Sequence, residues 1–316
     1  MKALVVGSGV IGLTTALRLQ EAGFTVRILT KTLPPETTSA VAAALWYPYK
    51  AYPEDRVLAW GRATLEAFYD LAADPATGVH IGTFVELLPA PAEAAPWWRG
   101  AVRTYRRATP ADLRPGYPDG FVAEAPLIET PVFLRYLVRR FEAGGGVIER
   151  KEVRDLAALA APDRLVVHCT GLGARALCGD DTVYPIRGQI VRVANPGIER
   201  ALLEESGPLA MTYIIPRRRD VVLGGTADAG AWDLAPDPAV SERILRNARM
   251  LEPRLAGAEV LEVRVGLRPA RPAVRLEPDP AHPTLLHHYG HGGSGFTLCW
   301  GCADAVAALA HHAIMP

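Results

Sequence analysis

Several features that would place a chain in a particular functional class are scarce or missing here. The 316 residues carry 34 basic and 34 acidic side chains, and this zero net charge argues against nucleic acid or an anionic membrane as a partner. No apolar run is long enough to span a membrane. The apolar start, MKALVVGSG, runs into glycines without a cleavage-site pattern, and the C-terminus carries no recognisable targeting tripeptide. We therefore expect a cytoplasmic protein.

Cysteine and metal-binding patterns are equally sparse. Four cysteines are too few for a disulfide scaffold. Cys299 and Cys302 have C-x-x-C spacing, which suits either a redox or zinc half-site or two small apolar residues on one helix face. We favour the helix face, because no second Cys/His pair has metal-ligand spacing. Histidines gather between 287 and 312 without an H-E-x-x-H pattern, so the sequence predicts no metal site. No G-x-S-x-G nucleophile motif and no P-loop lysine occur.

What the sequence does have is a glycine motif between a strand and a helix. The apolar run 2–6 ends in Gly7-x-Gly9-x-x-Gly12, a helical pattern follows, and a second strand spans 25–29. In such a unit the first glycine makes the turn, the second admits a pyrophosphate, and the third lets the helix pack on the strand. The helix N-terminus favours the phosphate charge. This arrangement predicts dinucleotide binding.

The second strand departs from the pattern of a free-NAD site. Such sites carry an acidic residue at the strand end to bind a ribose hydroxyl, and here that position is Thr30, followed by Lys31. We therefore expect other groups to bind the ribose.

The rest of the chain alternates between segments with α/β patterns and segments typical of antiparallel sheet. Residues 33–55 look irregular, and 80–126 mix short strands with Pro/Gly turns. Helices are predicted at 56–73, 130–143, 238–251 and 295–313, and strands at 147–151, 164–169, 186–193, 211–216, 220–225, 259–268 and 284–289. This alternation predicts an α/β fold, with a Rossmann-like nucleotide-binding domain and an interleaved α+β substrate domain on an antiparallel sheet. The first domain would comprise 1–50, 127–185 and 264–316, and the second 51–126 and 186–263.

A second strand–glycine–helix turn lies near the C-terminus, at residues 289–297 (YGHGGSGFT). Its helix N-terminus would form a second anion site, which suits an extended cofactor with a second electron-rich end, such as a flavin. The alternative is a structural glycine turn that caps the last helix. We expect His291 to be structural.

Arg268 and Tyr213 are the side chains that best suit substrate binding. Arg268 ends the strand that begins near 259, where it could offer a bidentate fork to a carboxylate. The alternatives are that it forms a surface ion pair, or that Arg264 or Arg271 binds the carboxylate. Tyr213 begins the strand segment YIIP, where ordinary strand packing is equally compatible with the sequence.

Taken together, these segments resemble the D-amino acid oxidase family of FAD enzymes, which includes D-aspartate oxidase, along nearly the whole chain. The matching blocks are GSGVIGLTTAL (7–17), TTS (37–39), VAAALWYPY (41–49), CTG (169–171), RGQI (187–190), YIIP (213–216), LGG (223–225), GLRPARP (266–272) and YGHGGSGFT (289–297). The last two blocks are the most specific.

The resemblance implies a substrate site. The carboxylate of a D-amino acid would be held by Arg268 and Tyr213, and a carbonyl of Gly293 or Ser294 would accept from the amino group. Two positions depart from the family pattern and would reshape the pocket: Tyr47, and Leu209, where some members have a second active-site tyrosine.

The resemblance also implies non-covalently bound FAD. Its contacts would be Gly7, Gly9, Val10, Ile11, Gly12, Thr30, Lys31, Thr37, Thr38, Ala43, Ala44, Leu45, Val153, Thr170, Gly171, Arg268, Gly292, Gly293, Ser294, Gly295, Phe296 and Thr297.

The implied reaction is oxidative deamination of neutral, apolar D-amino acids to 2-oxo acids and ammonia. A hydride would pass from the substrate Cα to FAD, and O₂ would reoxidise the flavin to give H₂O₂. The rival activities are D-aspartate oxidase, for which Arg217 or Arg218 could bind a second carboxylate, and glycine or sarcosine oxidase. A non-catalytic nucleotide-binding protein is a further alternative. The lack of a peroxisomal-type C-terminal signal suits a bacterial cytoplasmic enzyme, and a homodimer is compatible with the sequence.

Overall fold

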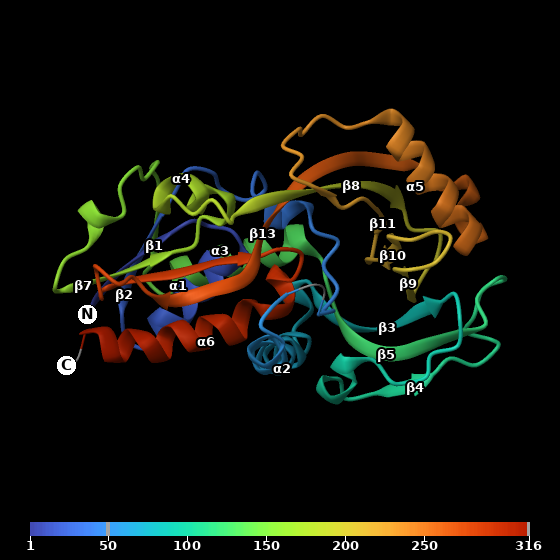
Figure 1. Ribbon diagram of the computed structural model, residues 1–316, viewed down its shortest axis with the longest axis horizontal. Helices are drawn as coiled ribbons and strands as arrows, with labels where there is room; N and C mark the ends of the chain where they lie inside the picture. The colour runs from blue at the N-terminus through green and yellow to red at the C-terminus, as the bar shows by residue number, and fades with distance from the viewer. Residues whose placement is uncertain (49–50, 315–316) are drawn as a thin grey trace.

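The strands of the computed structural model, which describes residues 1–48 and 51–314, join into one large twisted sheet (Figure 1). One part is parallel and runs in the order β14-β7-β1-β2-β6. Its strands are β14 (Leu285–His291), β7 (Arg164–His168), β1 (Lys2–Val6), β2 (Thr25–Thr30) and β6 (Val147–Arg150). Parallel strands covered on both faces read as apolar runs, which is why β1 and β7 are buried almost throughout.

The other part of the sheet is mostly antiparallel and follows in the order β4-β5-β3-β9-β10-β11-β8-β13. These strands are β4 (Tyr105–Arg107), β5 (Asp119–Ile128), β3 (Val79–Leu88), β9 (Ala201–Glu204), β10 (Thr212–Pro216), β11 (Asp220–Gly224), β8 (Tyr184–Ala194) and β13 (Val260–Pro278), with β12 (Asp228–Ala229) pairing to β8. The α/β fold class is confirmed. One pair, β3–β9, is parallel, which the expected antiparallel sheet did not include.

Three strands are longer than the sequence predicted. β3 and β5 are ten residues each and pair along their whole length, because the prolines of this region other than Pro126 lie in the connection between them. β13 continues beyond residue 268 to Pro278, with a register shift between Ala270 and Arg275 where it passes from β8 to β14. It thus crosses the predicted domain boundary at 263–264, and the proposed division into two interleaved domains stays a prediction.

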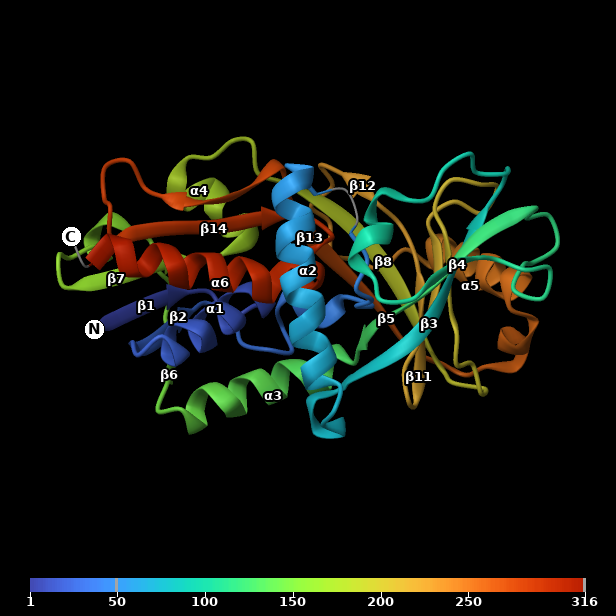
Figure 2. The same ribbon diagram turned by 90° about the horizontal axis from the view of Figure 1, so that it is seen from below.

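The helices gather around the parallel part of the sheet (Figure 2). α1 (Val10–Glu21) packs against α6 (Gly295–Ile314) and α3 (Thr130–Ala143), and α2 (Glu54–Leu71) crosses between the two halves. α4 (Ala174–Cys178) lies on the other face, and α5 (Pro238–Leu251) covers the antiparallel part. Within the described residues, no helix is long and apolar enough to cross a membrane.

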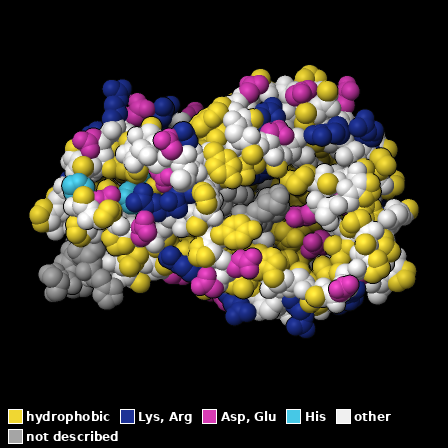
Figure 3. All heavy atoms as spheres, in the orientation of Figure 1, with side chains coloured by type: hydrophobic (Ala, Val, Ile, Leu, Met, Phe, Trp, Pro, Cys, Tyr) yellow, Lys and Arg dark blue, Asp and Glu magenta, His cyan; other side chains and the backbone are white. Residues whose placement is uncertain are grey.

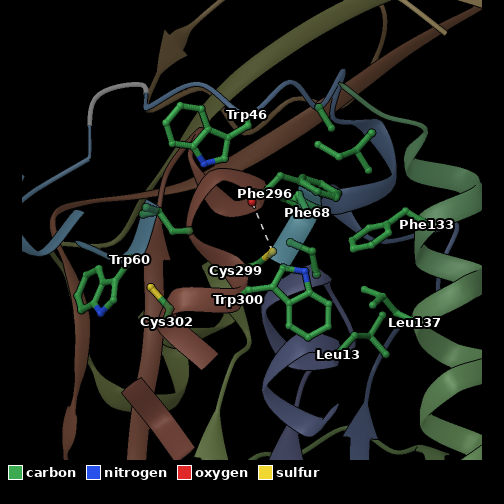
Figure 4. Packing of buried hydrophobic residues seen from close by; sticks show 14 of the residues in the cluster. Leu13, Trp46, Trp60, Phe68, Phe133, Leu137, Phe296, Cys299, Trp300 and Cys302 are labelled. Carbon is green, nitrogen blue, oxygen red and sulfur yellow. Dashed lines mark hydrogen bonds between the residues drawn. The ribbon is translucent and has the colours of Figure 1, made fainter. Parts of the chain in front are cut away.

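The C-x-x-C pair lies in the hydrophobic core, as expected for a helix face (Figure 4). Cys299 and Cys302 are free thiols on α6 and are fully buried, and the thiol of Cys299 donates to the Phe296 carbonyl. Gly301 lets α6 approach α2, since a Cβ there would lie 2.2 Å from the Trp60 carbonyl oxygen. The helix–helix contact thus depends on a small residue beside the two thiols.

Candidate active site

A cavity of about 830 Å³ runs along the carboxyl ends of the parallel strands and under the antiparallel sheet. Its walls come from the loops after β1, β2, β6, β7 and β14 and from one face of β8, β10 and β13. The N-termini of both α1 and α6 face it, at Val10 and Gly295. The position of a ligand site at the carboxyl ends of parallel strands is the usual one for this architecture.

The first glycine turn forms one wall of this cavity. Gly7 has a φ of +112°, and a Cβ there would lie 2.4 Å from the Cys169 carbonyl oxygen. A Cβ on Gly12 would lie 2.0 Å from the Gly7 carbonyl oxygen, so only glycine lets α1 start against the turn. Gly9 precedes the helix without a side-chain cap, while the Val10 amide donates to Ser39 Oγ at 3.0 Å. The turn leaves room for a phosphate at the start of α1.

The end of β2 supplies polar groups in place of the missing acidic residue. Thr30 Oγ1 donates to the Thr32 carbonyl at 2.7 Å, and Lys31 pairs with Glu152 at 3.0 Å. Glu36 and Glu152, which the sequence reasoning did not name, both line the cavity at this end. Either carboxylate can accept a hydrogen bond from a ribose hydroxyl.

The second glycine turn also lines the cavity. Gly290 and Gly292 have φ values of +87° and +54°, and α6 begins at Gly295. His291 lines the cavity and is buried, and burial lowers its pKa to about 3. The imidazole is therefore neutral at pH 7, which suits the structural role expected for it.

Arg268 and Tyr213 have room beside the cavity because glycines lie opposite them. A Cβ on Gly188 would lie 2.4 Å from Arg268 Nη1, and a Cβ on Gly224 would lie 2.3 Å from the Tyr213 hydroxyl. Arg268 Nη1 donates to the Thr226 carbonyl at 2.9 Å. Both side chains line the cavity. These two glycines lie in the RGQI (187–190) and LGG (223–225) blocks, but nothing in the sequence indicates their spatial role.

The competing arginines are engaged elsewhere. Arg264 donates to the carbonyls of Ala40 and Pro35, and Arg271 pairs with Asp180 at 2.9 Å. Neither lines the cavity within the described residues. The structure therefore places Arg268, rather than Arg264 or Arg271, at the cavity.

An acidic pair lies beside Tyr47, the first of the two departures from the family pattern. Burial raises the pKa of the Tyr47 hydroxyl, and nearby Glu86 and Glu205 raise it further. Burial, with the charge of Glu205, also raises the pKa of Glu86 to about 7. Tyr47 and Glu205 line the cavity, whereas Leu209 packs in a separate hydrophobic cluster and lies outside the lining. Tyr49, which ends the same block as Tyr47, lies outside the described residues.

Nearly all the residues predicted to contact the cofactor line this cavity. Those that do not are Gly12, Ser294 and Thr297. Gly12 acts through packing, as described above, and Thr297 Oγ1 donates to the Tyr47 carbonyl at 2.8 Å. Ser294 is buried where α6 begins. Glu205 and Met211 also line the cavity but have no signal in the sequence, because lining from an irregular segment or a strand edge has no sequence period.

The residues present fit FAD. The glycine cradle at 7–12 accommodates a pyrophosphate, and the second helix N-terminus, at Gly295, faces the same cavity beside Val10. Two positive helix ends suit a cofactor that is anionic in its middle and electron-rich at one end.

Comparisons with known proteins agree with this fit. The family model described as FAD dependent oxidoreductase matches residues 2–309. A D-amino-acid oxidase from Rubrobacter xylanophilus is 54% identical over 99% of this chain and 97% of its own length. A human D-aspartate oxidase is 36% identical over 96% of this chain and 93% of its own length. The fold is similar to that of a Bacillus cereus glycine oxidase, with a TM-score of 0.83 at 21% identity over 98% and 95% of the two chains. FAD is thus the cofactor of this chain, which belongs to the FAD dependent oxidoreductase family.

Proposed function

We propose that this enzyme deaminates neutral D-amino acids oxidatively, giving 2-oxo acids, ammonia and H₂O₂. The observation that carries the proposal is that Arg268, Tyr213 and the 291–295 turn line one cavity. The names of the relatives, above all the D-amino-acid oxidase from R. xylanophilus, support the D configuration. FAD, when bound, supplies the acceptor for the hydride on Cα and passes the electrons to O₂.

Arg268 is proposed to hold the substrate carboxylate. Its Nη1 already donates to the Thr226 carbonyl, which orients the guanidinium and leaves further N–H groups for a bidentate contact. No acidic partner of Arg268 occurs within the described part of the chain. A charge-assisted contact of this kind fixes the substrate so that Cα faces the flavin.

The remaining contacts are proposed for Tyr213 and the second glycine turn. The Tyr213 ring lies over Gly224 and Gly225 at the cavity wall, from where its hydroxyl can donate to the same carboxylate. Gly293 lies on the turn before α6, where its carbonyl can accept from the substrate amine. Together these groups would leave the side chain of the substrate pointing towards Tyr47 and Leu203.

The charges around the cavity favour neutral substrates over D-aspartate. The basic residues among the described lining are Lys31, Lys151, Arg154 and Arg268, and the first three follow β2 and β6 at the ribose end. Arg217 is buried against backbone carbonyls, and Arg218 is exposed, so neither described arginine supplies a second carboxylate site. A second carboxylate would instead meet Glu205.

A substrate panel tests the proposal. Peroxide release should be fast with D-alanine, D-valine and D-methionine, slow with D-aspartate and glycine, and absent with L-amino acids. A preference for D-aspartate would move the chain to the rival activity, and a preference for glycine or sarcosine would exclude the D-amino acid assignment.

A pair of arginine variants tests the carboxylate site. Arg268→Met should lose about 2–5 kcal/mol of transition-state binding, read as kcat/KM, while the protein keeps its flavin spectrum. Arg264→Met serves as the matched control, because Arg264 lies outside the cavity lining. If Arg264→Met loses turnover while Arg268→Met keeps a near-normal kcat/KM, the carboxylate site lies at Arg264 instead. A cytoplasmic location and a homodimer also stay predictions, which cell fractionation and size-exclusion chromatography would check.

A further inference from the structure

A cluster of one cysteine and two histidines lies behind the cofactor cavity, on side chains that the proposed reaction does not use. His168 ends β7, His287 lies beside it on β14, and Cys178 ends α4. Both imidazoles are buried and the thiol is half-buried. None of the three lines the cavity. The sequence showed no such cluster, because the three positions share no metal-binding spacing.

The potential ligand atoms converge on one point. His168 Nδ1 lies 3.3 Å from His287 Nδ1, and Cys178 Sγ lies 3.3 Å and 3.8 Å from these two nitrogens. In a tetrahedral zinc site with Zn–N near 2.0–2.1 Å and Zn–S near 2.3 Å, the N···N edge is about 3.3 Å and the N···S edge about 3.6 Å. The observed triangle matches one face of that tetrahedron.

The outer nitrogens of both rings are held as they are in metal sites. His287 Nε2 lies 3.0 Å from Asp279 Oδ2, and His168 Nε2 lies 2.6 Å from Thr170 Oγ1. An ionised carboxylate only accepts, so His287 carries its proton on Nε2 and directs the Nδ1 lone pair inward. The same tautomer of His168 donates to the Thr170 hydroxyl, and its Nδ1 lone pair then points at the same centre.

The surrounding charges suit a divalent cation. Asp180 pairs with Arg271 at 2.9 Å, and Arg275 pairs with Glu277 at 2.8 Å. These two pairs are neutral as units. The charges left at the cluster are the Asp279 carboxylate and, once a metal displaces its proton, the Cys178 thiolate. Two negative charges balance one M²⁺ ion.

We propose that His168, Cys178 and His287 form a site for a zinc-like divalent transition metal, with Asp279 as its outer carboxylate. Nitrogen and sulfur ligands favour Zn²⁺ and its late first-row neighbours over Mg²⁺ or Ca²⁺. The half-buried thiol leaves access for a water as the fourth ligand. The site clamps β7, β14 and α4 together, and Thr170 connects it to the turn that lines the cofactor cavity. Its role is therefore structural, in holding this turn.

A second cluster, His288, His291 and Cys302, is the competing location. Its three side chains are fully buried, and the Nε2 atoms of both histidines have no hydrogen-bond partner within the described residues. No carboxylate joins this cluster among the described residues, so a divalent ion with a single thiolate would leave a buried net charge. His288 and His291 also line the cofactor cavity. The charge balance favours the first cluster.

Metal content of the FAD-loaded enzyme tests the proposal. Chelator-treated protein, incubated with Zn²⁺ and desalted, should retain one equivalent by mass spectrometry, whereas Cys178→Ser should retain less than about a tenth of that. Asp279→Asn should weaken Zn²⁺ binding by about 10–100-fold in calorimetry. Cys302→Ala is the control and should keep its zinc. Each variant's flavin spectrum reports whether it has folded.

Two further readouts separate metal binding from a hydrogen-bonded chain. Co²⁺ should give tetrahedral d–d bands beyond the flavin absorption in wild type and Cys302→Ala, but not in Cys178→Ser. Zn²⁺ should raise the Tm of wild type and leave that of Cys178→Ser unchanged. If wild type retains no more zinc than Cys178→Ser, the proposal is overturned. The cluster is then a hydrogen-bonded chain from Thr170 through the two imidazoles to Asp279. Loss of zinc in Cys302→Ala would also overturn it, by moving the metal to the second cluster.

Discussion

At the scale of single residues, glycines opposite the functional side chains decide where those side chains lie. Arg268 can extend over β8 because residue 188 has no side chain, and Tyr213 lies flat over Gly224 for the same reason. The sequence identified Arg268 and Tyr213 as candidates, but the approach that makes room for Arg268 joins β8 and β13, which lie far apart in the chain.

Gly188→Ala should therefore impair substrate binding without unfolding the protein. The new Cβ would lie 2.4 Å from Arg268 Nη1, at the far end of a flexible side chain that can move away. KM for a D-amino acid should rise roughly 10-fold or more, the equivalent of about 1.4 kcal/mol, with an unchanged flavin spectrum. Gly257→Ala is the control, since a Cβ there meets nothing within 4 Å. Equal KM values in the two variants would contradict this account of Gly188.

Glu86 makes stability depend on pH. Its folded pKa is raised from 4.5 to about 7, so the folded state binds more protons than the unfolded state between these values. Stability must then fall as pH rises through this window, by roughly 3 kcal/mol for a 2.5-unit shift. Tyr47 and Glu205 are the ionisable groups that face it.

Replacing this carboxyl by the neutral isostere should remove that dependence. In denaturant titrations from pH 5 to pH 8, Glu86→Gln should be more stable than wild type at the upper end and similar at the lower end. The control is Glu142→Gln, which alters an exposed carboxyl outside the cavity lining. If the unfolding free energies of wild type and Glu86→Gln change with pH in the same way, the pKa of Glu86 is not raised in the folded protein.

At the scale of elements, the segment before α2 depends on a buried arginine from the β10–β11 turn. Arg217 Nη2 donates to the carbonyls of Ala42 and Ala43 at 2.9 and 3.2 Å and to Thr130 Oγ1 at 3.1 Å. Ala42 and Ala43 line the cofactor cavity, so the arginine supports the site from behind. The neighbouring Arg218 is exposed, although the sequence made the two look alike.

Arg217→Met should thus cost on the order of 3 kcal/mol of unfolding free energy, because three buried or partly buried acceptors lose their donor. FAD should also bind more weakly, which a flavin-release assay would measure. Arg218→Met should stay within about 0.5 kcal/mol of wild type. Similar losses in both variants would argue that charge in the turn, rather than these hydrogen bonds, is what matters.

At the scale of the whole molecule, FAD is expected to join the two halves of the sheet, since its cavity has walls from both.

The space-filling view shows charges of both signs scattered over the visible face, without a patch of one sign (Figure 3). Binding to the folded state alone adds about 2.7 kcal/mol at a ligand concentration 100 times Kd.

Removal of FAD should accordingly lower Tm by about 5 °C or more, and added FAD should restore it. Riboflavin lacks the pyrophosphate that the α1 N-terminus and Gly7 turn are proposed to bind, so it should restore less. Thermal denaturation of the apoprotein with each ligand measures both effects. Equal recovery with riboflavin and FAD would contradict the proposed pyrophosphate site.

Local sequence patterns by themselves determined the bounds of some helices and the cofactor turns. Helices α3 and α5 begin and end where their caps, periodicity and glycine stops predict, and the glycine turns at 7–12 and 289–297 face the cavity as expected. Such features depend on neighbours within a few residues, and so they can be read from the chain.

Only the tertiary structure decided which side chains meet. Strand pairing brings Gly188 under Arg268, Glu86 behind Tyr47, and His168 beside His287, across separations that no sequence period encodes. The same pairing sends Arg264, Arg271 and Arg217 away from the cavity, although all of them looked suitable in the sequence. The physical reason is that register between distant strands is set by packing and hydrogen bonding over the whole sheet.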